Sequence, residues 1–136
     1  MLNKKFLSAT CIALAITGSV AFAAVQQGKV MYKQADGTYV VNTTTLTPNV
    51  KGFKGATPVE VYIKNNKVVK VVPLANHESP RYFNTVKQNL LPKFEGMKVA
   101  KAAKAEQVDG ATGATFSSRA IKANVAAAVA YYKKNK

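Results

Sequence analysis

The chain has 136 residues, enough for one small domain, and 48% of them are hydrophobic, so a packed core is expected rather than general disorder. Lys and Arg number 20 against 6 Asp and Glu, which gives a formal net charge of +14, and there is one Cys and one His. These counts exclude a Cys/His zinc site, a Cys-ligated iron–sulfur cluster and haem attachment through C-x-x-C-H. A Ser-His-Asp triad would have to use the only histidine, His77.

Residues 1–23 have the pattern of a signal peptide. Lys4 and Lys5 supply the positive start, residues 6–17 are mainly apolar and uncharged, and Ala-Phe-Ala at 21–23 gives the small-x-small pattern that a signal peptidase accepts. The alternative is a retained membrane anchor, but the apolar run is shorter than the ~20 residues of a spanning helix. The pattern therefore favours export and cleavage.

Cleavage after Ala23 leaves residues 24–136 as the mature domain. We expect this domain in the periplasm or on the outer face of the cytoplasmic membrane. Cys11 lies inside the apolar run and leaves with the signal, so the mature domain has no cysteine for a disulfide. It must fold on its hydrophobic core alone.

The first half of this domain is rich in predicted strands. Residues 30–32 and 38–41 flank an Asp-Gly pair at 36–37 and predict a first hairpin. Residues 43–48 are also β-prone but end at a proline.

The second hairpin is the clearest strand prediction. Residues 59–63 alternate apolar and polar side chains, the period of a half-buried strand. Asn65 and Asn66 tolerate positive φ and are suited to a tight turn into a strand over 67–72. A glycine-bounded loop, residues 52–55, precedes this hairpin.

The second half has helical spacing. Ser79 is suited to cap a helix with Pro80 at its first position. Four apolar residues then recur at helical spacing, namely Phe83, Val86, Leu90 and Phe94. Pro92 must kink or end that helix. For residues 98–106 the sequence leaves helix, strand and loop open.

The final helix is predicted from an apolar stripe. Ser117 or Ser118 is expected to cap it. The stripe consists of Ile121, Val125, Val129 and Tyr132. The expected fold is therefore α+β, with a small antiparallel β-sheet packed against helices and a C-terminal helix after a glycine-containing loop.

The glycine-containing loop, residues 109–118, is where the sequence points to chemistry. It has a bare backbone and four hydroxyl side chains, and it leads directly into the final helix. The first turn of a helix offers free N–H groups and the positive end of a dipole, which suits a phosphate. A flexible loop with an ordinary N-cap fits the same residues, and the Lys of a P-loop is missing. The residues alone leave both interpretations open.

Residues 109–115, Asp-Gly-Ala-Thr-Gly-Ala-Thr, resemble the Asp-x-x-Ser/Thr-Gly-Ala-Thr flavinylation motif of FMN-binding domains. Related domains occur in subunits of the sodium-pumping NADH:quinone oxidoreductase and in small exported flavoproteins. The resemblance implies that FMN is joined through its phosphate to the hydroxyl of Thr115. It also implies a separate magnesium-dependent flavin transferase that uses FAD as the donor.

The resemblance gives roles to four residues before the acceptor. It implies that Asp109 and Thr112 act in motif recognition or arrange the acceptor hydroxyl. It also implies that Gly113 and Ala114 keep that hydroxyl accessible. Phe116 adjoins the acceptor, and we expect it beside the flavin. Two further aromatic residues, Tyr82 and Phe83, either border the ring or belong to the core.

The resemblance extends over about residues 37–135. The loop at 52–55 and the hairpin after it are similar to the glycine loop and hairpin of the family. Residues 77–80, His-Glu-Ser-Pro, resemble its His-x-Glu-Thr-Pro-Gly region near the flavin, which implies that His77 is a cofactor-binding residue. Here that region is one residue shorter, has Ser for Thr, and has Arg81 where Gly is usual.

The function that the resemblance implies is electron transfer through the flavin. The chain has no G-x-G-x-x-G dinucleotide fingerprint, so we expect a carrier between membrane or periplasmic redox proteins rather than a self-sufficient enzyme. Two alternatives stay open. One is a small flavin-dependent reductase acting on its own substrate, and the other is an apo basic binding module of the cell envelope. No nucleic-acid motif is recognised, and no nucleic-acid partner is expected.

Overall fold

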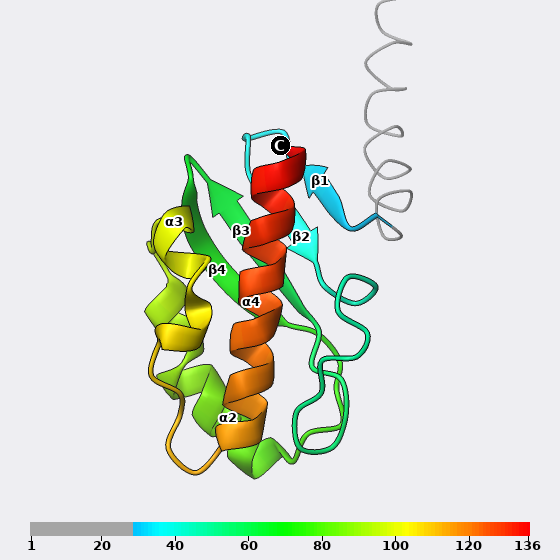
Figure 1. The fold of residues 1–136 in the computed structure, drawn as a ribbon, viewed down its shortest axis with the longest axis vertical. Helices are drawn as coiled ribbons and strands as arrows, with labels where there is room; N and C mark the ends of the chain where they lie inside the picture. The colour runs from blue at the N-terminus through cyan, green and yellow to red at the C-terminus, as the bar shows by residue number, and fades with distance from the viewer. Residues whose placement is uncertain (1–28) are drawn as a thin grey trace, which may run out of the picture.

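The computed structural model describes residues 29–136 of the chain (Figure 1). The expected signal peptide, residues 1–23, and Cys11 within it lie outside the described residues. The described part holds a four-stranded antiparallel sheet and several helices, with a long helix at the C-terminal end. The predicted α+β class is therefore confirmed. Among residues 29–136, no helix is both long and apolar enough to cross a membrane.

The elements follow the predicted order of strands first and helices second. In chain order they are β1 (Met31–Lys33), β2 (Tyr39–Asn42), β3 (Val59–Lys64), β4 (Lys67–Pro73), α2 (Pro80–Asn89), the 3₁₀ helix η1 (Leu91–Phe94), α3 (Val99–Ala102), the 3₁₀ helix η2 (Ala105–Gln107) and α4 (Thr115–Asn135).

The sheet has the strand order β1-β2-β3-β4, and every neighbouring pair is antiparallel. Both predicted hairpins form, each within one residue of its expected bounds. Asn65 and Asn66 adopt φ values of 53° and 59°, as a tight turn between β3 and β4 requires. Residues 43–48 form turns rather than a strand, and the backbone N–H of Thr47 donates to the carbonyl of Thr43 at 3.0 Å.

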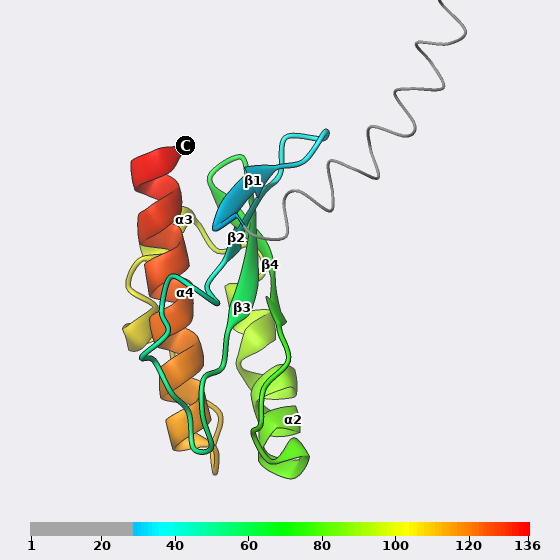
Figure 2. The same ribbon diagram turned by 90° about the vertical axis from the view of Figure 1, so that its right-hand side faces the viewer.

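One face of the sheet is covered by α4, which lies along it (Figures 1 and 2). Val59, Val61 and Ile63 are fully buried, whereas the residues between them on β3 are half-buried. The stripe predicted on the last helix packs into the same core. Burying each such side chain stabilises the fold by roughly 1.5–3 kcal/mol.

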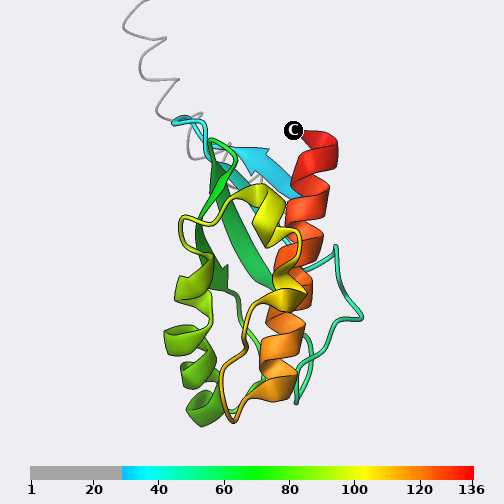
Figure 3. The same ribbon diagram turned by 60° about the vertical axis from the view of Figure 1, so that its left-hand side comes forward.

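The predicted helix ends before Pro92, as this proline requires. Helix α2 ends at Asn89, and η1 begins at Leu91 with the proline in its first turn. Leu90 and Phe94 are both fully buried, which explains why their spacing continues the apolar pattern of α2. The segment left open, residues 98–106, forms α3 and the start of η2, beside β4 and α4 (Figure 3).

The predicted cap of the last helix is wrong. Helix α4 begins at Thr115, and its N-cap is Ala114, whose side chain makes no capping hydrogen bond. Ser117 and Ser118 lie buried in the first turn because their hydroxyls have partners outside the helix. The Ser117 hydroxyl donates to Glu78, and the Ser118 hydroxyl accepts the backbone N–H of Ala111 at 2.9 Å.

Helix α4 runs along the domain, and its first and last turns lie at opposite ends of it (Figure 1). Its first turn lies near the start of α2. Its last turn lies near the β3–β4 turn, where the Tyr132 hydroxyl donates to the side-chain oxygen of Asn66 at 2.9 Å. The glycine-containing loop and the lysine-rich C-terminal turn are therefore at opposite ends.

Candidate functional site

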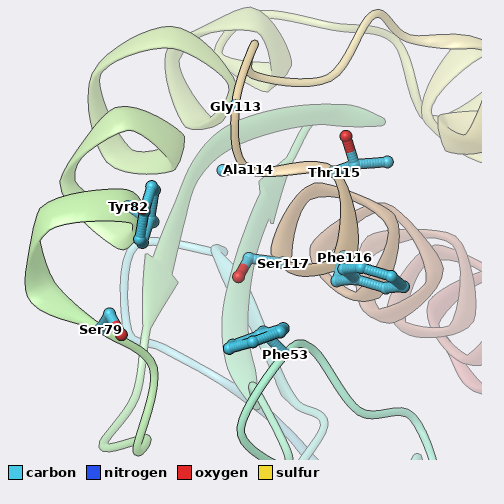
Figure 4. Close-up of a pocket in the computed structure, with 8 residues that line it drawn as sticks. All are labelled: Phe53, Ser79, Tyr82, Gly113, Ala114, Thr115, Phe116 and Ser117. Atoms are coloured by element: carbon cyan, nitrogen blue, oxygen red, sulfur yellow. The ribbon is translucent and has the colours of Figure 1, made fainter.

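A cavity of about 290 Å³ opens at the first turn of α4 (Figure 4). This volume lies at the lower end of the range of about 300–1,000 Å³ for small-molecule pockets. Its lining comes from the loop before β3, from the start of α2 and from the start of α4. The lining residues are Phe53, Ser79, Tyr82, Gly113, Ala114, Thr115, Phe116 and Ser117.

Three exposed aromatic rings surround this cavity. Phe53 is 69% exposed, Tyr82 is 51% exposed and Phe116 is 58% exposed. The rings of Phe53 and Phe116 lie 6.1 Å apart, tilted by 39°. Single exposed aromatic residues need no explanation, but three around one cavity indicate a site for a ligand with a flat apolar part.

The other side of the cavity is the start of α4, which suits an anionic group. The first turn has free backbone N–H groups and the positive end of the helix dipole. No acidic residue lies in this turn, and Ala114 has no side chain to cap it. Gly113 has φ +83°, a conformation that glycine adopts without strain, and turns the chain into the helix. An apolar surface and a helix end that suits an anion thus meet at Thr115.

Lysines hold the loop that leads to Thr115. The Lys93 ammonium donates to the carbonyl of Asp109 at 3.0 Å, and the Lys122 ammonium donates to the carbonyl of Val108 at 2.9 Å. Together with the bond from the Ala111 N–H to Ser118, these contacts fix the loop against η1 and α4.

Glu78 connects the segments that form the cavity. It is only 7% exposed, and its carboxylate accepts hydrogen bonds from the backbone N–H of Phe53 at 2.8 Å and from that of Lys54. It also accepts the hydroxyl of Ser117 in the first turn of α4. One carboxylate therefore joins the Phe53 loop, the segment before α2 and the start of α4.

The hydrogen bonds also keep this carboxylate ionised. Burial acts to raise the pKa of Glu78, but the bonds from Ser117 and from the backbone of residues 53–54 outweigh it, aided by the charge of Lys54. The pKa therefore lies below its ordinary value.

Gly52 is required where the loop meets this carboxylate. A Cβ atom at this position would lie 2.1 Å from the Glu78 carboxylate oxygen and 3.1 Å from a methyl carbon of Thr57. Because neither distance allows an ordinary contact, a side chain here would push the loop away from Glu78.

The structure brings together four of the seven site residues expected from the sequence. The four that line the cavity are Gly113, Ala114, Thr115 and Phe116. The other three are exposed and do not line it: His77, Asp109 and Thr112. Asp109 lines a separate hollow together with Lys93 and neighbouring lysines.

Phe53 and Glu78 are site residues that the sequence did not assign. The sequence predicts only that Phe53 belongs to the loop at 52–55, and its place in the cavity depends on how that loop packs beside the starts of α2 and α4. Glu78 precedes the Ser79-Pro80 helix start, and no spacing rule predicts partners 24, 25 and 39 residues away. Tyr82, left open by the sequence, lines the cavity.

The hydrogen bonds to the Glu78 carboxylate predict that the free energy of unfolding falls at acid pH. The pKa of Glu78 is lowered from the ordinary 4.5, so its contribution to stability is complete above that pH and is lost as the pH falls through the folded-state pKa. Glu78→Gln removes the charge and turns an amide N–H₂ toward other donors. We expect the free energy of unfolding at neutral pH to fall by about 1–3 kcal/mol.

Urea unfolding curves between neutral pH and pH 3 check this expectation. Below pH 4.5, the free energy of unfolding of the Glu78→Gln variant should depend less on pH than that of the protein with Glu78. The matched control is Glu95→Gln, at an exposed position, which should change stability by no more than about 0.5 kcal/mol. Equal effects of the two substitutions would contradict a special role of Glu78.

One known protein family matches this chain. A family model described as "FMN-binding domain" matches residues 52–130, more than half of the chain. No curated protein and no solved structure matches the chain. The matched segment begins at the glycine that packs on Glu78 and includes the whole cavity lining. The chain belongs to the FMN-binding domain family.

Proposed function

We propose that the protein is an exported flavoprotein that carries FMN covalently on Thr115 and passes electrons between partner redox proteins. The observation that carries this proposal is the position of Thr115. Thr115 is exposed at the start of α4 and lines the same cavity as the three exposed aromatic rings. The family match supports FMN as the ligand.

The residues present fit FMN. The first turn of α4 supplies N–H groups and a positive dipole end for the phosphate, without an acidic side chain to repel it. Phe53, Tyr82 and Phe116 supply apolar faces for the ring. When bound, the flavin supplies the exchange of one or two electrons, and the protein supplies attachment, orientation and electrostatics.

Attachment is a phosphoryl transfer from FAD. The hydroxyl oxygen of Thr115 forms a bond to the phosphorus that bears the riboflavin moiety, and the bond from that phosphorus to the AMP portion breaks. AMP leaves, and the hydroxyl proton passes to a base of the transferase. The exposed positions of Asp109 and Thr112 fit contact with that transferase rather than with the finished cofactor.

The charged side chains around the cavity support the carrier role. Lys54, Arg81 and Arg119 are all exposed near this end, where Glu78 is buried and hydrogen-bonded and Asp109 is the exposed acidic residue of the loop before α4. This end therefore presents positive charge, which favours encounter with an acidic protein surface. The whole chain is strongly basic, and this charge strengthens the same effect.

Thr115→Ala is expected to give a folded, colourless protein after expression together with a flavin transferase, because the acceptor hydroxyl is gone. Thr115→Ser is the matched control and should retain covalent flavin, because it retains a hydroxyl. Peptide mass mapping and the visible absorbance of denatured protein measure the outcome. FMN found on Thr112, Ser117 or Ser118 would contradict the assignment.

Isolated flavin-loaded protein is expected to react slowly with NADH and without saturation, because no dinucleotide site holds the nicotinamide in a reactive geometry. Reduction by the partner reductase should be fast and should slow as salt screens the charges. Stopped-flow mixing measures both reactions. Rapid, saturable NADH oxidation by the protein alone would make it an enzyme and contradict the carrier role.

The mature protein is expected to begin at Ala24, since Ala-Phe-Ala at 21–23 meets the requirement of a signal peptidase. N-terminal sequencing of the protein from the native cell checks this. A retained Met1, or a lipid on Cys11, would contradict it.

A further inference from the structure

The end of the domain opposite the flavin cavity carries a hollow of about 380 Å³ surrounded by lysines. Its lining combines the β3–β4 turn, the start of α3 and the last turn of α4. The lysines are Lys67, Lys98, Lys133 and Lys136, and all four are exposed.

This lysine hollow is built by specific contacts. The Asn66 side-chain oxygen accepts hydrogen bonds from the Tyr132 hydroxyl at 2.9 Å and from the Lys136 ammonium at 3.0 Å. The Asn66 carbonyl accepts the backbone N–H of Val99 at 2.9 Å. Three elements are therefore joined at one turn residue, which keeps the four lysines together.

The positive charge of the lysine hollow is not balanced by acidic side chains. None of the six acidic residues of the chain lines it. Within residues 29–136 the one ion pair joins Lys64 and Asp36, at 3.8 Å, and includes none of the four lysines. The end of α4 contributes only about half a negative charge through its dipole.

This end is too far from Thr115 to be the site where a redox partner makes electronic contact. Helix α4 has 21 residues and so separates Thr115 from the lysine hollow by about 30 Å. Electron transfer slows steeply with distance, so a donor or acceptor must approach the aromatic end. A surface that recognises four lysines here needs negative charge but no electronic contact with the flavin.

We propose that the lysine hollow binds the phosphate headgroups of an anionic phospholipid surface. Lysines near such a surface are attracted to it, and a headgroup phosphate accepts hydrogen bonds from several ammonium groups. Binding at this end holds the aromatic cavity on the far side of the domain, open to partner proteins. The inference goes beyond the proposed function: the exclusion of a redox partner at this end rests on flavin at Thr115, whereas the attraction of the four lysines to phosphate does not.

Co-sedimentation of the exported protein with vesicles tests this proposal, after N-terminal sequencing has verified that the signal is gone. Binding is expected to vesicles of phosphatidylglycerol and not to vesicles of phosphatidylcholine. It should weaken as the Debye length falls from about 30 Å at 0.01 M salt to about 8 Å at 0.15 M. The colourless Thr115→Ala protein should bind equally, which separates this result from any failure of flavin attachment.

A pair of double variants tests the location. Lys67→Gln with Lys133→Gln should weaken binding about thirtyfold, the effect of removing two lysines at a lipid surface. Arg81→Gln with Arg119→Gln removes the same charge at the aromatic end and should weaken binding less than about threefold, because Arg119 lies about 20 Å along α4 from Lys133 and Arg81 lies on α2 at the same end as Arg119.

Three results would overturn the proposal. One is equal weakening by both double variants, which would show that net charge alone drives adsorption. Another is no binding to phosphatidylglycerol at low salt. The third is release of the protein from the vesicles by inorganic phosphate at constant ionic strength. This result would make the hollow a site for free phosphate.

Discussion

The Glu78 carboxylate is the contact on which the cavity at the start of α4 depends. It accepts hydrogen bonds from two consecutive backbone N–H groups of the Phe53 loop and from a hydroxyl in the first turn of α4. A buried carboxylate is stable only where such donors surround it, so the loop and the helix are held in one arrangement. The aromatic side chains that line the cavity come from the segments that this carboxylate joins.

The domain has two ends with different chemistry, and α4 connects them. One end presents exposed aromatic rings and a helix N-terminus, which suits a flat anionic cofactor. The other presents four lysines around a turn. A helix packed on a sheet keeps these ends apart, so that a contact at one end leaves the other end open (Figure 1).

Much of the fold could be predicted from the sequence because it depends on local patterns. The alternation over 59–63, the two asparagines after it and the stripe on the last helix each specify an element without reference to the rest of the chain. The start of α4 could not be predicted, because serines near a helix start ordinarily cap it, whereas the partners of Ser117 and Ser118 lie elsewhere in the fold. The motif indicated Thr115, but Phe53 and Glu78 join the site only through tertiary contacts.

A crystal structure of the flavin-loaded protein is the most direct test of flavin attachment at Thr115. We expect continuous electron density from the Thr115 hydroxyl oxygen to a phosphate at the start of α4, with the ring against Phe53, Tyr82 and Phe116. Density for flavin at another residue, or a ring placed away from these three side chains, would contradict it.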